Sequence, residues 1–158
     1  MNKRTKKNFW LYGIAALVLL LDQLSKYFLV GYRCVLIPGI VNLTTAFNEG
    51  VAMSMLSGAG VILPVVTGLI TLLGFYFAGK YARGTMACIA CGMVLGGAVG
   101  NLVDRVLLGY VIDLFEFTFV DFYIFNVADI GITCGAVLCG ISILFFEKRD
   151  WRTKADHE

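Results

Sequence analysis

Four apolar stretches constrain this chain more than any other feature of its sequence. A membrane helix needs about 20 apolar residues to cross the hydrocarbon core of a bilayer. Four stretches approach or exceed that length, at 9–30, 61–78, 86–103 and 127–146. The chain of 158 residues is 59% hydrophobic with a mean hydropathy of +0.81, whereas soluble domains carry more charge. We therefore expect an all-α membrane protein with four transmembrane helices, forming a single domain over 1–158.

Basic residues flank the apolar stretches and predict the orientation of the chain. Lys- and Arg-rich segments stay on the cytoplasmic side of a membrane. With both termini and the 79–85 turn cytoplasmic, 31–60 and 104–126 are extracytoplasmic. Nucleic-acid binding also uses basic patches, but clusters that flank apolar stretches are better explained by topology. The clusters contain ten of the 13 basic residues, namely Lys3, Arg4, Lys6, Lys7, Lys80, Arg83, Lys148, Arg149, Arg152 and Lys154.

The ends of the first apolar stretch favour a retained anchor. A cleaved signal peptide has a small-residue cleavage site after its apolar core, and this stretch instead continues into DQLSKYFLV.

The extracytoplasmic segment 33–56 is rich in β-branched and aromatic residues separated by turn formers, so we expect a small β-containing cap there. The segment 114–125 is strongly aromatic, which is typical of chain resting at the level of the lipid headgroups.

The residue types available exclude several catalytic classes. The only histidine is His157 in the charged tail, so a Ser-His-Asp triad, a Cys-His dyad and an HExxH zinc site would all need that tail to reach the site. Cys88 and Cys91 form a CxxC, a pattern of redox and metal sites. They lie in the middle of an apolar stretch without other candidate ligands, which favours helix packing. We expect neither a metal nor a cofactor.

The unusual polar residues of the chain all map to one layer, near the outer surface of the membrane. An ionisable group at the end of a membrane segment is costly and usually has a partner and a function. Two aspartates in one place can share a proton, so that one draws a proton from water and the other donates to the carbonyl oxygen of a scissile amide. The layer contains Asp22, Lys26, Asn48, Asn101, Asp104, Arg105, Asp113, Asn126 and Asp129.

Each of these residues also has a structural interpretation. Asp22 and Lys26 are four residues apart, a spacing that favours an ion pair on a helix. Arg105 can bind a lipid phosphate, and Asn101 can form hydrogen bonds between helices. The glycines spaced by four in the third stretch need no more than close helix packing to explain them.

Helix capping is the main structural alternative for the fourth apolar stretch. Asn126 can cap the helix that begins there, which places Asp129 at the third helical position, where a carboxylate is favourable. That interpretation leaves Asp113 unexplained.

Two other functional classes fit part of the pattern. Aspartates within a membrane often relay protons, which suggests a small proton-coupled transporter or channel subunit. A relay needs polar steps across the full membrane, and the cytoplasmic halves of the four stretches are almost purely apolar. A structural subunit of a larger complex would explain the glycines and gives no reason for paired aspartates.

Four sequence blocks resemble those of the lipoprotein signal peptidases, the type II signal peptidases of bacteria. The blocks are DQLSK at 22–26, FNEGVAMS at 47–54, GGAVGNLVDRVLLGYVID at 96–113 and FNVAD at 125–129. The last two, in this order and at this spacing, are the most specific. The resemblance extends over roughly 10–146.

The resemblance implies roles for individual residues. Asp113 and Asp129 correspond to the catalytic aspartates of the family, with no covalent intermediate. Asn101, Arg105 and Asn126 match its supporting polar residues. The remaining characteristic positions are Asp22, Lys26, Asn48 and Asp104.

The resemblance also implies the substrate. The family removes the signal peptide of a prolipoprotein just before a cysteine that carries a diacylglyceryl thioether, at the outer face of the inner membrane. We therefore expect an aspartic endopeptidase that acts on lipidated precursors as a monomer and is inhibited by the cyclic peptide globomycin. We also expect the aromatic segment 114–125 and the cap to close over the peptide. The departures from the family pattern are Val51, Met53, Leu114 and Ile130, which affect pocket lining rather than the carboxylates.

Overall fold

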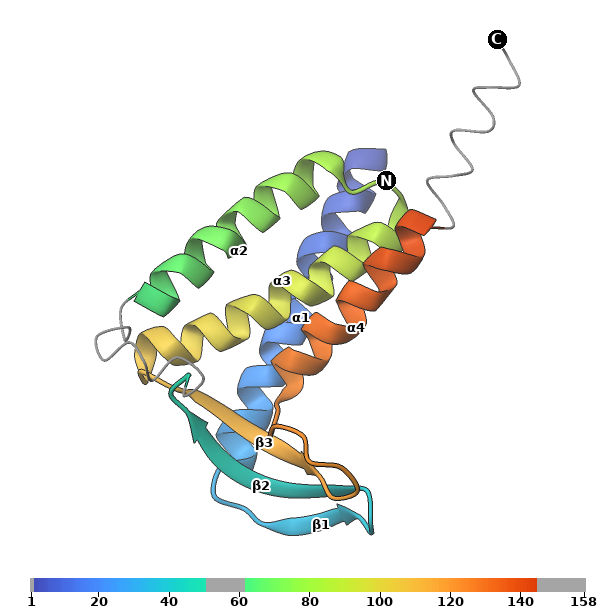
Figure 1. The fold of residues 1–158 in the computed structure, drawn as a ribbon. Coiled ribbons are helices and arrows are strands. Elements are labelled where there is room, and N and C mark those ends of the chain that lie inside the picture. Colours follow the sequence, from blue (N-terminus) through green and yellow to red (C-terminus); the bar gives the residue numbers. More distant parts are fainter. Residues whose placement is uncertain (1, 51–61, 145–158) are drawn as a thin grey trace.

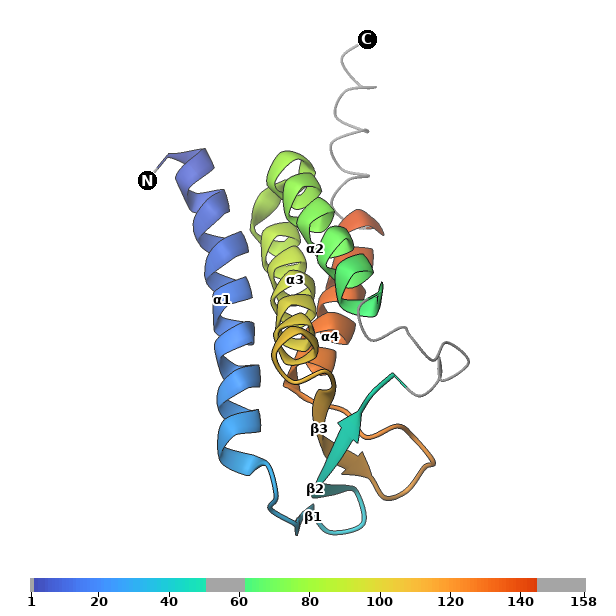
Figure 2. The same ribbon diagram turned by 90° about the vertical axis from the view of Figure 1, so that its left-hand side faces the viewer.

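A helical bundle with a small sheet at one end makes up the described part of the chain (Figure 1). The structure is a computed structural model that describes residues 2–50 and 62–144. The N-terminal end of the first helix and the turn between the second and third lie at the end of the bundle away from the sheet (Figure 2). In chain order the elements are α1 (Lys3–Leu29), β1 (Cys34–Ile37), β2 (Val41–Asn48), α2 (Ile62–Tyr81), α3 (Gly84–Leu107), β3 (Val111–Phe117) and α4 (Val127–Ser142).

Within residues 2–50 and 62–144, three helices are long and apolar enough to cross a membrane, namely Thr5–Leu29, Ile62–Tyr81 and Gly84–Leu107. The fourth, Val127–Ser142, is a shorter apolar helix. The expected membrane fold is thus confirmed in its helical character and in its small sheet. The number of spans stays a prediction, because the end of the fourth expected stretch, at 145–146, lies outside the described residues.

The helix α3 lies at the centre of the bundle and packs against both α1 and α4. Small residues make this close packing possible. A Cβ added to Gly96 would lie 2.5 Å from the carbonyl oxygen of Ala15 in α1. A Cβ added to Gly100 would lie 2.6 Å from Oδ2 of Asp22. The glycines spaced by four therefore mark helix contacts, as the sequence predicted.

The three strands form an antiparallel sheet in the order β1-β2-β3. β2 lies between the other two, and Ala46 on β2 is opposite Asp113 on β3. The expected β-containing cap is therefore present. Its sheet also includes a strand at Val111–Phe117, where the sequence predicted only an extracytoplasmic segment.

Several expected boundaries differ from those observed. The third helix continues to Leu107 rather than 103, so Asp104 and Arg105 lie in its last turns. Asn48, within the segment 33–56 expected to form the cap, is the last residue of the strand β2. Expectations for residues 51–61, which include Val51 and Met53, and for the basic tail with His157 lie outside the described residues.

Candidate functional site

Asp113 is buried on β3, and both of its carboxylate oxygens accept hydrogen bonds. Nδ2 of Asn126 donates to Oδ1 at 2.8 Å, and Nδ2 of Asn48 donates to Oδ2 at 3.1 Å. Because Ala46 is opposite Asp113, Asn48 two residues further along β2 lies on the same face of the sheet. The strand pairing therefore brings an amide donor to the carboxylate.

Asp129 lies in the first turn of α4 and takes part in a capping box. Its backbone N–H donates to Oδ1 of Asn126 at 3.0 Å, and its Oδ2 accepts from the backbone N–H of Asn126 at 3.1 Å. The capping interpretation is thus confirmed. Capping occupies only part of the carboxylate, because Oδ1 accepts from Nδ2 of Asn101 at 2.8 Å and the side chain stays partly exposed.

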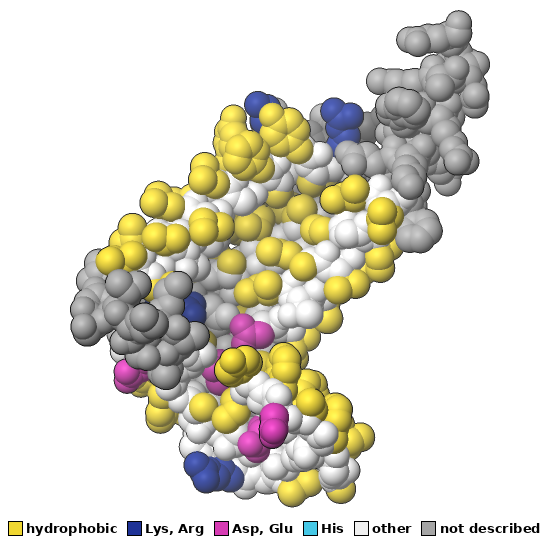
Figure 3. Space-filling view, viewed as in Figure 1, with side chains coloured by type: hydrophobic (Ala, Val, Ile, Leu, Met, Phe, Trp, Pro, Cys, Tyr) yellow, Lys and Arg dark blue, Asp and Glu magenta, His cyan; other side chains and the backbone are white. Residues whose placement is uncertain are grey.

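Asn126 connects the two aspartates. Its side-chain amide donates to Asp113, and its backbone N–H donates to Asp129. The same side-chain nitrogen lies 3.0 Å from Oδ1 of Asn101, and Asn126 is fully buried. A strand carboxylate and a helix carboxylate therefore meet at one asparagine. Acidic side chains gather where the sheet meets the bundle (Figure 3).

A buried cluster of charges supports this junction from α1 and α3. Nζ of Lys26 lies 2.8 Å from Oδ2 of Asp22 and 2.8 Å from Oδ2 of Asp104, and all three side chains are at most 3% exposed. The expected ion pair between Asp22 and Lys26 is present, and it includes a second carboxylate. A buried ion pair adds little net stability, but the loss of one partner is strongly destabilising. We call these three residues the buried ion cluster.

The buried ion cluster is bonded to the site at two places. Oδ1 of Asp22 accepts from the backbone N–H of Ala128 at 2.9 Å, so α1 holds the first turn of α4. Nζ of Lys26 lies 3.4 Å from Oδ1 of Asn101, whose nitrogen donates to Asp129. Because a lysine ammonium can only donate, Oδ1 of Asn101 faces Lys26 and Nδ2 faces Asp129.

Gln23 is a polar residue of this region whose role is not predicted from the sequence. Its Nε2 donates to Oδ1 of Asp104 at 3.0 Å and to Oδ2 of Asp22 at 3.1 Å, so it satisfies both acids of the buried ion cluster. Its signal in the sequence was an amide beside Asp22 within an apolar stretch.

Arg105 lies beside the site without contacting either aspartate by a hydrogen bond in the described residues. Its Nη1 donates to the backbone carbonyl of Asn101 at 3.3 Å, one turn earlier on α3. The side chain is partly exposed.

Burial changes the acidity of Asp113. Burial, with a smaller contribution from the negative charge of Asp129, raises the pKa of this carboxyl to about 6. The amides of Asn48 and Asn126 and the charge of Lys26 act in the opposite direction, and burial outweighs them. Asp113 is therefore an acid that keeps its proton at a higher pH than an exposed aspartate does.

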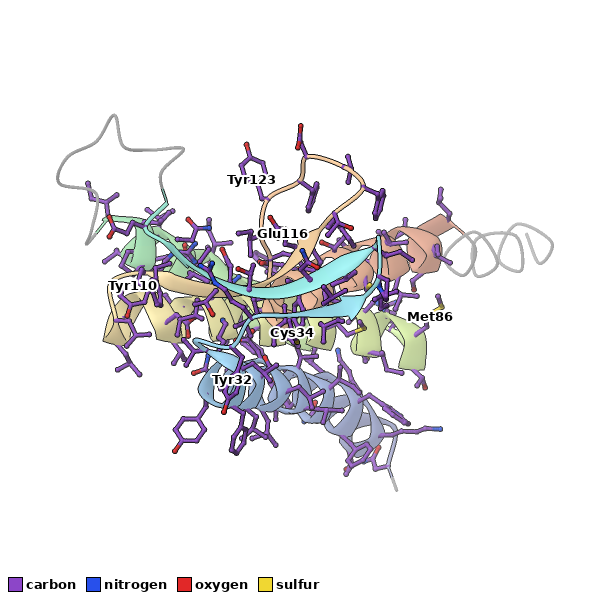
Figure 4. The ribbon with its side chains drawn as sticks, turned by 90° about the horizontal axis from the view of Figure 1, so that it is seen from below. Tyr32, Cys34, Met86, Tyr110, Glu116 and Tyr123 are labelled. Atoms are coloured by element: carbon purple, nitrogen blue, oxygen red, sulfur yellow. The ribbon has the colours of Figure 1, made fainter. Side chains whose placement is uncertain are left out.

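The described residues contain no group of three or more His, Cys, Asp and Glu side chains arranged to hold a metal. The CxxC cysteines lie on α3, where Cys91 contacts Cys139 of α4 with 4.0 Å between the sulfurs. This contact fits the packing role predicted for the motif. Cys34 is exposed on β1, and Tyr123 lies beyond β3, at the opposite edge of the sheet (Figure 4).

Comparison with known proteins gives the family. The family model for signal peptidase (SPase) II matches residues 14–145. This chain belongs to the signal peptidase II family. The lipoprotein signal peptidase of Latilactobacillus sakei subsp. sakei (strain 23K) is 39% identical over 145 residues, which cover 87% of this chain and 96% of that protein. That of Enterococcus faecalis (strain ATCC 700802 / V583) is 38% identical over 141 residues, which cover 85% and 88%.

The fold of the chain is similar to that of a solved bacterial membrane enzyme. A structure described as a bacterial membrane enzyme, determined by the in meso method at 1.9 Å resolution, superposes with a TM-score of 0.77. It is 34% identical and covers 84% of this chain and 91% of that one. This signal peptidase II is therefore a peptidase of the bacterial membrane that acts in lipoprotein processing by cleaving the signal peptides of prolipoproteins.

Proposed function

We propose that this signal peptidase II is an aspartic endopeptidase in which Asp113 and Asp129 activate the attacking water. The observation that carries the proposal is Asn126, which donates one hydrogen bond to each carboxylate. Two carboxylates held by one residue cannot both ionise cheaply, so the pair carries one proton over part of the pH range. One aspartate then acts as a base and the other as an acid.

The raised pKa of Asp113 supports an assignment of the shared proton to that residue. In the first step Asp129 removes a proton from water, the water oxygen bonds to the carbonyl carbon, and Asp113 donates its proton to the carbonyl oxygen. The product is a tetrahedral diol. In the second step Asp129 protonates the amide nitrogen as the C–N bond breaks, and Asp113 takes a proton from the diol. Both aspartates return to their initial states without a covalent intermediate.

The substrate we propose is a prolipoprotein whose cysteine already carries a diacylglyceryl group, with cleavage just before that cysteine. The aspartate pair lies where the sheet meets the bundle, and apolar side chains cover the outside of the helices, including Leu20, Leu21 and Tyr27. A site at such a boundary can admit water from one side and acyl chains from the other. The side chains positioned to orient the peptide or the carboxylates are those of Asn101, Asn126 and Arg105.

Aromatic rings around β3 support a location at the headgroup level. The ring centroids of Phe117 and Phe125 are 4.9 Å apart, and those of Phe117 and Phe122 are 5.9 Å apart. Aromatic side chains favour the membrane–water boundary. We propose that this end faces the extracytoplasmic side of the inner membrane and that both termini are cytoplasmic, in a monomer that binds globomycin at the same site. Closure of 114–125 and of the cap over the peptide predicts that a label at Glu49, which lies in the cap, loses accessibility when globomycin binds.

The test is cleavage of a purified lipidated precursor by the reconstituted enzyme. Asp113→Asn and Asp129→Asn should each abolish release of the signal peptide, because the asparagine side chain neither accepts the proton of water nor donates an acidic proton. Asp121→Asn is the matched control, since Asp121 is an exposed acid in the segment after β3. Near-normal cleavage by either of the first two variants, with the control active, would remove the aspartate pair from the mechanism.

A further inference from the structure

A cavity of about 230 Å³ lies at the end of the bundle away from the sheet, between the first turns of α1 and α3. Ligand pockets for drug-sized molecules are usually about 300–1,000 Å³. This cavity is smaller, and a compact polar group fits its size better than a whole substrate does. Its lining residues are Lys6, Lys7, Trp10, Gly84, Thr85 and Cys88.

Two lysines give this cavity a positive charge. Nζ of Lys7 donates to the carbonyl oxygen of Gly79 at 2.7 Å, which fixes the ammonium group beside the last turn of α2. An ammonium has three donors, so Lys7 retains donors for a further acceptor. Lys6 is exposed. Lys and Arg side chains are visible at this end of the molecule, away from the acidic side chains near the sheet (Figure 3).

The start of α3 adds backbone donors to the same cavity. The N-cap residue, Arg83, makes no capping hydrogen bond with its side chain. The first N–H groups of a helix have no partner within the helix and carry a partial positive charge, which favours anions. Gly84 and Thr85, in this first turn, both line the cavity.

Trp10 supplies an independent sign that an acceptor is missing. Its indole N–H is buried and has no hydrogen-bond partner in residues 2–50 and 62–144. Buried polar groups nearly always have a partner, so an unsatisfied one needs a specific explanation. The ring and the side chain of Cys88 give the cavity an apolar wall next to its two lysines.

We propose that this cavity binds the phosphate-bearing headgroup of an anionic membrane phospholipid. Lys6, Lys7 and the first turn of α3 would contact the phosphate, and Trp10 would pack against the headgroup. A lipid is the occupant because α1 and α3 have the length and hydropathy of membrane spans, so the cavity at their ends lies at the level of lipid phosphates. The exposed apolar side chain of Phe9 offers a surface for the acyl chains.

Quenching of Trp10 fluorescence by brominated lipids tests the proposal on the full-length chain. The chain has two tryptophans, so Trp151→Phe leaves Trp10 as the only one. This variant is reconstituted into phosphatidylcholine vesicles that contain a small fixed fraction of brominated phosphatidylglycerol or of brominated phosphatidylcholine. We expect several-fold stronger quenching by the anionic lipid. Lys6→Gln and Lys7→Gln should each abolish most of that preference, because each removes a charge-assisted hydrogen bond to the bound phosphate.

Lys80→Gln is the matched control, because it removes one positive charge at the same end of the bundle without touching the cavity lining. Lys80 instead lies over the rings of Tyr76 and Tyr81, with centroid distances of 5.8 and 5.1 Å. The preference of the Lys80→Gln variant for the anionic lipid should stay within twofold of that of the Trp151→Phe parent. Lys7→Gln keeps an N–H donor for the carbonyl of Gly79, and precursor cleavage in every variant reports that the fold is intact. Equal quenching by the two lipids, or an equal loss of preference in Lys80→Gln, would overturn the proposal.

Discussion

At the residue scale, Asn126 has two roles that different atoms perform. Its Oδ1 accepts from the backbone of Asp129 and caps α4, whereas its Nδ2 donates to Asp113. The capping role alone is worth about 1 kcal/mol of stability. The bond to Asp113 acts instead on a group that we propose to be catalytic. A substitution that keeps the cap and removes the amide therefore separates the capping role from the bond to Asp113.

Asn126→Ser is that substitution, because serine caps helices about as well as asparagine does. Both Asn126→Ser and Asn126→Ala leave buried acceptors on Asp113 and Asn101 without this donor, so we expect both variants to be destabilised in detergent. The alanine variant should lose about a further 1 kcal/mol, because only serine keeps the cap. We expect kcat of both to fall by about 10²-fold or more, since general acid–base catalysis contributes about 10²–10⁴-fold. A serine variant with wild-type kcat would show that Asn126 only caps the helix.

Asn48 controls the acidity of Asp113, and its effect has a definite sign. The amide of Asn48 donates to the carboxylate form and lowers the pKa of Asp113, while burial raises that pKa to about 6. The pair with one proton is therefore present below about pH 6 in the free enzyme and is lost as the pH rises through that value. We expect kcat/KM to decline with rising pH over this range.

Asn48→Ala removes the donor, so the pKa of Asp113 rises and the decline of kcat/KM moves to higher pH. The measurement is the pH profile of kcat/KM for wild type and variant with the same lipidated precursor. Thr45→Ala is a useful control, because Thr45 lies on the same strand and accepts from the backbone N–H of Gly31 at 2.9 Å. A decline that stays in place, or moves to lower pH, would contradict the proposed role of Asp113.

At the element scale, the contact between α1 and α3 depends on the absence of side chains along one face of α3. A methyl group at Gly96 would meet the carbonyl oxygen and the Cα of Ala15, at 2.5 and 2.9 Å. Backbone atoms cannot rotate away, so the two helices would have to separate. Separation would also strain the buried ion cluster, whose members come from both helices.

Gly96→Ala should therefore destabilise the chain by about 1–3 kcal/mol, the usual cost of overpacking a close contact. Gly13→Ala on α1 is the matched control, because a Cβ there meets nothing within 4 Å. Alanine also has the higher helix propensity, so the control should be neutral or stabilised by up to about 1 kcal/mol. Thermal unfolding in one detergent compares the two variants, and equal unfolding temperatures would show that the contact tolerates a methyl group.

At the scale of the whole molecule, the apolar stretches and their polar layer could be predicted because each depends on local composition. The helices follow from runs of apolar residues, and the ion pair of Asp22 with Lys26 follows from helical spacing. The strand at Val111–Phe117 was missed as a strand because its partner is the distant Val41–Asn48, and pairing across such separations leaves no local signal. For the same reason the contacts of Gln23 and of Lys26 with Asp104 cannot be predicted from the sequence, because they join α1 to α3.

The position of the site in the whole molecule leads to the last prediction, which concerns the lipid on the substrate. The aspartate pair lies at the sheet end of helices that can span a membrane, so a scissile bond must be held at that level for the water to attack it. Each buried methylene of an acyl chain contributes about 0.8 kcal/mol to membrane attachment, so two chains fix the cysteine at the headgroup boundary. A precursor without the diacylglyceryl group keeps its signal peptide in the membrane, but its cysteine is free to move away.

We expect kcat/KM to be lower by about 10²-fold or more for the unlipidated precursor in the same vesicles, with release of the signal peptide measured for both forms. The control is the enzyme variant Cys34→Ser, which should cleave the lipidated precursor normally because Cys34 is exposed on β1 and makes no described contact with the aspartates. Equal turnover of the two precursors would mean that the site recognises the peptide alone and that the lipid has no part in positioning it.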